Sequence, residues 1–287
     1  MKQAVLLVSH GTVDALDDLP AFLKNVRHGR DAPAELAAEL RKRYEAIGGS
    51  PLDAINVRLA GKLEKTLGVP VRRASRLWKP YVRDVLSELG ELQRVVVIPL
   101  AQHSAHVYGA AAKRDVASMS GDRVEVACAD NWGQRTDLLD AFARRARALA
   151  GKDAALVLTA HSLPTRVIAA GDAYEKETRA AARGVIDRVG AEYAETHVAF
   201  QSQGFGDGEW LGPGIPETLD ALAGRMKRVV FAPIGFLADH VEILYDLDVE
   251  ARALAEKRGL AYARTRSLDD ADDFVAILAD LAKDLLA

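Results

Sequence analysis

Four of the seven histidines stand where a parallel sheet would bind a ligand. His10, His103, His161 and His240 lie at or just beyond the carboxyl ends of short apolar segments rich in β-branched residues. Open α/β sheets bind ligands at that edge, in the crevice where the strand order reverses. A single histidine there could simply hydrogen-bond within its own loop, but four in equivalent places favour imidazoles facing one shared cleft.

Three carboxylates follow the last of these histidines at helical spacing. The segment Asp239–Leu254 has an apolar stripe at intervals of three and four, and this predicts a helix opened by an aspartate cap. Glu242, Asp246 and Glu250 then stand in a row on another face. A solvated acidic face is the alternative interpretation. Because the row begins beside His240, carboxylates and imidazole together suit a divalent first-row metal. The spacing does not match the HExxH zinc helix.

A glycine-rich stretch runs from Gln201 to Pro213 and contains Trp210. It reads either as a plain connection or as a loop that presents an aromatic wall to a flat ligand.

The motifs of several other classes are absent. Only His10-Gly11-Thr12 follows the first apolar segment, so dinucleotide binding is not supported, and the chain has no P-loop motif. Ser162 lacks the glycine-framed nucleophile elbow of hydrolases. A single cysteine, Cys128, excludes an internal disulfide, a thiolate zinc site and a self-contained iron–sulfur cluster.

Composition narrows the class further. With 38 basic and 41 acidic residues the net charge is −3, which gives no reason to expect nucleic acid. The longest apolar run, Val95–Ala101, is far shorter than the ~18 residues that a membrane span needs. The N-terminus lacks a signal-peptide layout, so we expect a cytoplasmic protein.

The elements that must position these residues alternate along the whole chain. We predict strands at Ala4–Ser9, Val69–Ala74, Arg94–Ile98, Arg123–Ala127, Ala155–Thr159, His197–Gln201, Arg228–Ala232 and Leu260–Ala263. Helical patterns include Pro33–Ile47, Trp78–Leu89, Thr136–Ala150 and Thr165–Val189. Continuous apolar strands that alternate with helices predict an α/β fold with parallel sheets covered on both faces.

The two halves of the chain resemble each other weakly. The segment Leu6–Thr12 has a counterpart in Leu156–Pro164, and Val95–His103 has one in Val229–His240. We therefore expect two Rossmann-like lobes, each with a four-stranded parallel sheet, over residues 1–150 and 151–269. A final helix within 270–287 is expected to pack back on the first lobe.

Seven motifs, spread over essentially the full length of the chain, are typical of one known family. They are Arg27–Arg30, Arg43–Leu52, Ala160–Pro164, Gly171–Tyr174, Gln201-Ser202, Trp210–Pro213 and Gly235–Glu242. In these motifs the sequence resembles the ferrochelatase family. The resemblance implies two Rossmann-like lobes with a porphyrin cleft between them, and the insertion of ferrous iron into that porphyrin.

The resemblance also implies roles for individual residues. His161 matches the metal-site histidine and Glu242 its partner carboxylate, while Asp246 and Glu250 continue the acidic row on the metal side. The residues that match or adjoin positions of the porphyrin site are His10, Arg27, Arg43, Tyr44, Ser50, His103 and Trp210. Compact bacterial members usually carry tyrosine where this chain has His10, which suggests an alternative axial ligand or proton acceptor.

We therefore expect a monomeric ferrochelatase of haem biosynthesis, with ferrous iron and a porphyrin as substrates. We expect no tightly bound cofactor, no iron–sulfur cluster, no nucleic-acid partner and no transmembrane segment. The alternatives are a non-catalytic porphyrin or haem carrier, and a chelatase for another metal and tetrapyrrole. The loop Val13–Leu19 carries three acids, and this favours the polar coproporphyrin III over protoporphyrin IX.

Overall fold

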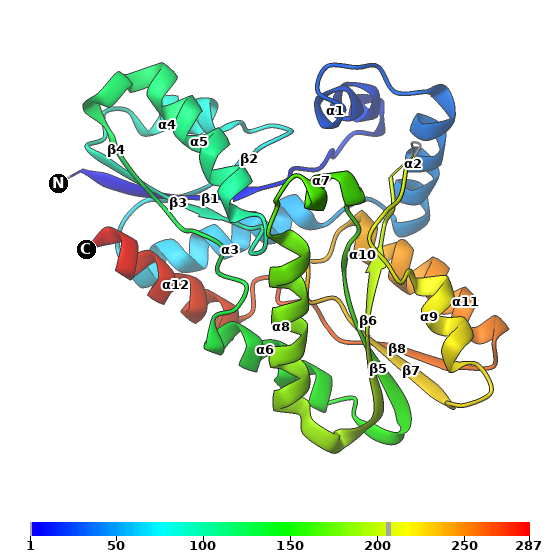
Figure 1. Ribbon diagram of the computed structural model, residues 1–287. Coiled ribbons are helices and arrows are strands. Elements are labelled where there is room, and N and C mark those ends of the chain that lie inside the picture. Colours follow the sequence, from blue (N-terminus) through cyan, green and yellow to red (C-terminus); the bar gives the residue numbers. More distant parts are fainter. Residues whose placement is uncertain (1, 205–207) are drawn as a thin grey trace. The chain divides into compact units, whose positions relative to one another are not determined.

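A computed structural model describes residues 2–204 and 208–287 (Figure 1). The chain divides into two compact units. Unit 1 comprises Met1–Trp132 together with Asp269–Ala287, and unit 2 comprises Gly133–Leu268. Each unit contains one four-stranded, all-parallel sheet flanked by helices, which confirms the predicted fold class.

The sheet of unit 1 has the order β2-β1-β3-β4. Its strands are β1 (Gln3–Ser9), β2 (Val71–Ser75), β3 (Arg94–Pro99) and β4 (Glu125–Cys128). The helices of the unit are α1 (Leu19–Val26), α2 (Ala34–Ile47), α3 (Leu52–Leu67), α4 (Val82–Leu89), α5 (Ala105–Ser120) and α12 (Asp272–Leu286). The central strands read as unbroken apolar runs because helices cover both faces of the sheet.

The sheet of unit 2 repeats this arrangement in the order β6-β5-β7-β8. Its strands are β5 (Gly151–His161), β6 (Tyr193–Gln201), β7 (Arg228–Ala232) and β8 (Ala261–Arg264). The helices are α6 (Thr136–Arg147), α7 (Thr165–Ala169), α8 (Tyr174–Val189), α9 (Ile215–Leu222), α10 (Val241–Leu244) and α11 (Arg252–Lys257). Between α10 and α11 lies a π-helical segment, Asp246–Ala251.

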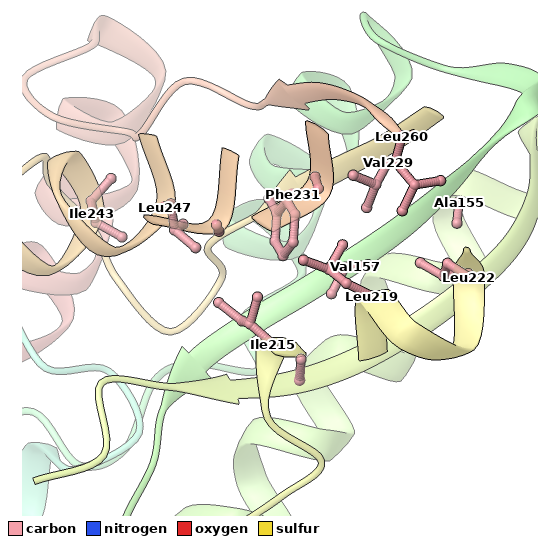
Figure 2. Packing of buried hydrophobic residues seen from close by; sticks show 13 residues of the cluster. Ala155, Val157, Ile215, Leu219, Leu222, Val229, Phe231, Ile243, Leu247 and Leu260 are labelled. Atoms are coloured by element: carbon pink, nitrogen blue, oxygen red, sulfur yellow. The ribbon is translucent and has the colours of Figure 1, made fainter. Parts of the chain in front are cut away.

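A buried cluster holds this helical segment on the sheet of unit 2 (Figure 2). Val157 of β5 and Phe231 of β7 contribute the strand side, and Ile243 and Leu247 contribute the helical side. All four side chains are fully buried. The residues between Ile243 and Leu247 are therefore fixed against the sheet by hydrophobic packing.

The strand orders show where the four histidines lie in the two sheets. In each sheet the second strand pairs with one edge of the first strand, and the third strand pairs with its other edge. The strand order therefore reverses between β1 and β3 and between β5 and β7. His10 follows β1, His103 follows β3, His161 ends β5 and His240 follows β7. Every one of them lies at the reversal point of its own sheet, where such folds bind ligands.

The helices differ from the predicted pattern in two places. The single helix expected over Thr165–Val189 is two helices, α7 and α8, because Gly171 adopts a positive φ of 98° between them. The helix expected over Asp239–Leu254 begins only at Val241, with His240 as its N-cap, so the predicted aspartate cap is wrong.

The units also divide at a different point from the repeat in the sequence. The division falls at Trp132–Gly133 rather than near Gly151, because α6 packs against α8 of unit 2. Helix α12 packs against α3, β3 and β4 of unit 1. Across residues 2–204 and 208–287, no helix has the length and apolar character needed to cross a membrane.

Candidate active site

His161 occupies the last position of the central strand β5, where one neighbouring carbonyl group sets the orientation of its ring. Its Nδ1 is hydrogen-bonded to the carbonyl oxygen of Ser162. Since a carbonyl oxygen can only accept, Nδ1 carries the hydrogen, and Nε2 of the neutral ring keeps its lone pair. The backbone is held in turn, because Tyr174 donates its hydroxyl to the His161 carbonyl at 2.9 Å. The ring is therefore arranged so that Nε2 can bind a metal or accept a proton.

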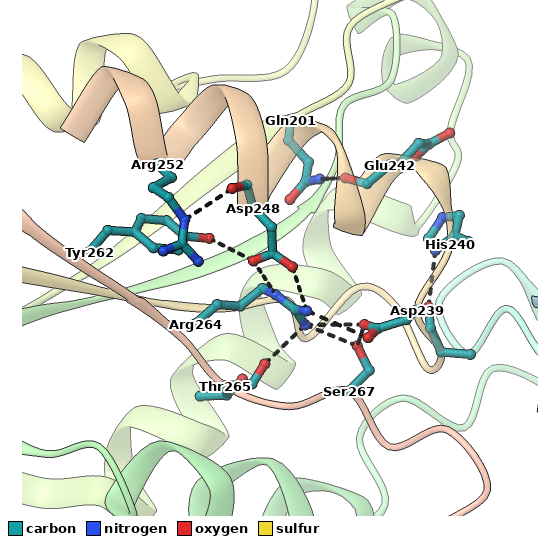
Figure 3. Close-up of polar contacts among 11 residues, drawn as sticks. Gln201, Asp239, His240, Glu242, Asp248, Arg252, Tyr262, Arg264, Thr265 and Ser267 are labelled. Atoms are coloured by element: carbon teal, nitrogen blue, oxygen red, sulfur yellow. Dashed lines mark hydrogen bonds and ion pairs between the residues drawn. The ribbon is translucent and has the colours of Figure 1, made fainter. Parts of the chain in front are cut away.

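Glu242 reaches this imidazole from the second residue of α10. Its Oε2 lies 3.6 Å from His161 Nε2, and the two side chains are 32% and 34% exposed. The backbone carbonyl of Glu242 accepts a hydrogen bond from Gln201 Nε2 at 2.9 Å, which ties α10 to the end of β6. Figure 3 shows this bond beside Arg264 and its carboxylate partners.

The separation of the two side chains suits a shared metal ion. His161 Nε2 and Glu242 Oε2 are donors of the kind that divalent first-row metals bind, and at 3.6 Å they are close enough to hold the same ion. Within residues 2–204 and 208–287, no group of three or more His, Cys, Asp or Glu side chains is arranged to hold a metal. Two donors leave the other coordination positions to water or to an incoming ligand, as in sites with open positions.

The acidic row differs from the regular pattern expected of an α-helix. In the π-helical segment the amide of Glu250 bonds to the Tyr245 carbonyl at 2.9 Å, five residues back. Asp246 is only 6% exposed and accepts a hydrogen bond from the Ser202 hydroxyl, so it does not belong to a solvated face. Ser202 itself sits at a φ of 60°, a backbone strain that occurs mostly at functional sites.

In unit 1 the structure brings His10 and Tyr44 into separate hydrogen bonds near the end of β1. His10 Nδ1 lies 3.1 Å from the Tyr108 hydroxyl. Thr12 Oγ1 lies 2.8 Å from the Tyr44 hydroxyl, and Tyr44 is buried. Neighbouring Arg43 pairs with Glu39 at 3.0 Å along α2.

The other predicted ligand-site residues lie on loops of their own units. Arg27 ends α1 and donates to the Asp31 carbonyl at 3.3 Å, and the Ser50 hydroxyl accepts from the Leu52 amide at 3.5 Å. His103 is buried in the turn before α5. In unit 2, half-buried Trp210 forms a β-bridge with Pro164. Phe205, Gly206 and Asp207 of the glycine-rich loop lie outside the described residues.

Three polar residues that contact predicted site residues of their own units were not predicted themselves. Gln201 and Ser202 hold the segment that carries Glu242 and Asp246, and Tyr108 contacts His10. For Gln201 and Ser202, the only signal in the sequence was their match to a motif of the family that the sequence resembles. No pattern in the sequence indicated Tyr108, because it sits on the buried side of α5.

The structure thus defines an α/β protein with two matching parallel sheets and an imidazole–carboxylate pair at the reversal point of the second sheet. Among solved structures, the chain is similar to CbiX, described as the terminal enzyme for biosynthesis of siroheme in denitrifying bacteria. The TM-score is 0.58 and the identity is 17%, over 99% of this chain and all of that one.

Sequence comparison then identifies the family. The sequence model of ferrochelatase matches residues 2–286. A ferrochelatase of Acidobacterium capsulatum is 36% identical over 98% of this chain and 94% of its own length. A coproporphyrin III ferrochelatase of Anoxybacillus flavithermus is 31% identical over 96% of this chain and 93% of its own. The chain therefore belongs to the ferrochelatase family, the enzymes that insert ferrous iron into a porphyrin in haem biosynthesis.

Proposed function

We propose that His161 and Glu242 carry out the iron insertion. His161 acts as an iron ligand or as the acceptor of a pyrrole proton, and Glu242 acts as the second ligand or as the exit for that proton. The observation that carries this assignment is the 3.6 Å separation between His161 Nε2 and Glu242 Oε2, with Nδ1 of the imidazole already committed to a carbonyl.

The reaction makes two demands that this pair meets. Two pyrrole protons must leave the porphyrin, and the water shell of the iron must give way to four ring nitrogens. Imidazole suits proton transfer near neutral pH because its ordinary pKa is ~6.5. A carboxylate beside it stabilises the imidazolium that forms, and general-base assistance of this kind contributes ~10²–10⁴-fold to a rate.

Porphyrin binding supplies the remaining energy. A flat macrocycle hides its nitrogen lone pairs, so the protein must favour a puckered ring. Strain of ~1–5 kcal/mol can be drawn from contacts with remote parts of a substrate. We assign those contacts to His10, Arg27, Arg43, Tyr44, Ser50, His103 and Trp210, and we place Asp246 and Glu250 on the route of the metal.

Replacement of the imidazole is the sharpest test. We expect His161→Ala to abolish iron insertion while porphyrin binding, measured by the change in porphyrin absorption, survives. Glu242→Gln should lower the turnover rate without lowering the melting temperature, because the carboxamide keeps the shape of the side chain. Iron insertion that persists in His161→Ala would refute the assignment. Porphyrin binding without turnover in the unaltered protein would favour the carrier instead.

We further propose coproporphyrin III as the porphyrin. The loop after β1 exposes the charged residues Asp14 and Asp17 to solvent rather than an apolar surface. In addition, one relative is named as a coproporphyrin III ferrochelatase. Turnover with coproporphyrin III should exceed turnover with protoporphyrin IX under identical conditions. The reverse order would overturn this choice without affecting the assignment of His161.

Three further properties of the protein are its oligomeric state, its location in the cell and its cofactor content. We propose a cytoplasmic monomer without a tightly bound cofactor. Since Cys128 is the single cysteine, it could supply only one of the thiolates that an iron–sulfur cluster needs. Size-exclusion chromatography, cell fractionation and sulfide analysis of the purified protein test these three points.

A further inference from the structure

The guanidinium of Arg264, at the end of β8, lies between two carboxylates that flank Glu242 in the chain (Figure 3). Its Nη1 donates to Asp239 at 3.1 Å. Its Nε and Nη2 form a fork on the two oxygens of Asp248, at 2.8 and 2.7 Å. The side chain of Arg264 is only 11% exposed. Bidentate pairs of this kind fix orientation as well as charge.

Further bonds make this arrangement rigid. The hydroxyl of Tyr262 donates to Asp248 at 3.3 Å, and Arg252 Nε donates to the Asp248 carbonyl at 3.0 Å. Ser267 donates its hydroxyl to Asp239. Burial works against the charge of Arg264, but its hydrogen bonds and its attraction to Asp248 and Asp239 outweigh burial, so its pKa lies above the ordinary value.

The segment between the two carboxylates has little regular structure to hold it. Helix α10 has four residues, and no side chain caps its N-terminus at His240. The π-helical geometry that follows is rare and occurs mainly as single turns at functional sites. Contacts from outside the segment therefore keep Glu242 in place. Hydrophobic packing of Ile243 and Leu247 and the hydrogen bond from Gln201 hold the middle of the segment, and the ion pairs of Arg264 hold its two ends.

We propose that Arg264 is a positioning residue for iron insertion. By holding Asp239 and Asp248 together, it fixes the helical segment that keeps the Glu242 carboxylate beside His161. This inference rests on the proposed function of that pair. A misplacement of about 1 Å at a catalytic group can cost 10²-fold in rate, so the loss of these ties should appear in the chemistry and not only in stability.

The test compares three full-length variants. Arg264→Met removes both ion pairs, and Arg264→Lys keeps the charge but not the fork. Arg258→Met is the matched control, because Arg258 also pairs with one aspartate, Asp220 at 2.7 Å, in the same unit. Steady-state kinetics yield kcat, the KM for ferrous iron and the KM for porphyrin, and thermal denaturation confirms that each variant is folded.

We expect Arg264→Met to lower kcat/KM for iron at least tenfold while the KM for porphyrin changes less than twofold. Arg264→Lys should recover part of the loss, and Arg258→Met should match the unaltered protein. A folded Arg264→Met with normal iron kinetics would overturn the inference. If that variant does not fold, Asp248→Asn carries the same test, because it removes one ion pair and keeps the side-chain shape.

A double-mutant cycle separates this inference from the proposed function. If Arg264 acts through Glu242, adding Arg264→Met to Glu242→Gln should lower the rate less than twofold further. Fully additive losses would show that Arg264 does not act through Glu242. If Glu242→Gln alone kept normal turnover, the proposed function would fail, and the inference would fail with it. If Glu242→Gln were impaired but Arg264→Met were normal, only the inference would fail.

Discussion

Gly235 has no side chain, and this allows the loop that leads to Glu242 to cross the end of β5. The amide of Gly235 donates to the Thr159 carbonyl at 2.9 Å. A Cβ at this position would lie 2.5 Å from the Cβ of Ala160 and 2.6 Å from its Cα. Non-bonded carbon atoms do not approach each other this closely, so the loop or the strand would have to shift. The close approach of this loop to β5 thus requires glycine at position 235.

Gly235→Ala should therefore destabilise the protein by ~1–3 kcal/mol, the usual cost of overpacking, and lower iron turnover. Gly61→Ala is the matched control, since a Cβ there meets nothing within 4 Å and the residue lies inside α3. That control should stabilise by ~0.5–1 kcal/mol because alanine favours the helix. Urea unfolding followed by circular dichroism measures both effects. Equal stability of Gly235→Ala and the unaltered protein would contradict the close approach.

Among the helices, α6 ends on a carbonyl, that of Ala146, which accepts one hydrogen bond from the Leu149 amide at 3.0 Å and a second from a strand residue. The last carbonyls of a helix have no partner within it. Tyr193, at the start of β6, donates its hydroxyl to the Ala146 carbonyl in the last turn of α6 at 2.6 Å. Burial raises the pKa of Tyr193 to about 12. This bond between elements therefore holds only while the phenol keeps its proton.

The raised pKa predicts a loss of stability in alkali. The folded protein favours the neutral phenol, so this stabilisation is complete below about pH 10 and disappears as the pH rises through about 12. With a pKa of about 12 in the folded protein, the stabilisation lost in alkali amounts to ~2–3 kcal/mol. Urea midpoints measured between pH 9 and 12 should fall less steeply for Tyr193→Phe than for the unaltered protein. Burial also raises the pKa of Tyr262, so some slope should remain. Identical slopes would contradict the role of Tyr193.

At the scale of the whole molecule, the chain completes unit 1 only with its last helix. Phe274 of α12 stacks on Trp132 with ring centres 6.4 Å apart, and Leu278 is fully buried. Arg58 and Lys62 of α3 pair with Asp270 just before α12, at 3.0 and 3.4 Å. Unit 1 is thus assembled from the two ends of the chain.

Leu278→Ala should cost ~2–5 kcal/mol because it leaves a cavity in the core of unit 1. Asp280→Ala on the exposed face of α12 should change stability by less than ~0.5 kcal/mol. Hydrogen exchange measured by mass spectrometry should show lost protection in β3, β4 and α3. An equal loss in β5 and β7 would show that the two units do not unfold separately.

Much of the architecture was predictable because its signals are local. Apolar runs such as Val95–Ile98 mark strands buried on both faces, and every strand of the structure overlaps one of the eight predicted. The weak repeat indicated two similar sheets, and the strand-end histidines indicated a candidate ligand site. Hydrophobic periodicity and strand ends depend on neighbouring residues, so one sequence is enough to reveal them.

Only the tertiary structure decided how those residues meet. The contact between His161 and Glu242 and the fork of Arg264 on Asp248 join residues that are separated in the sequence. The π-helical geometry after Tyr245 differs from α geometry by only one residue in its hydrogen-bond spacing. An apolar stripe looks nearly the same in α and π geometry, and no spacing in the sequence encodes which arginine will find which carboxylate. Packing of the whole unit makes those choices, because each contact forms only when the elements on both sides are already in place.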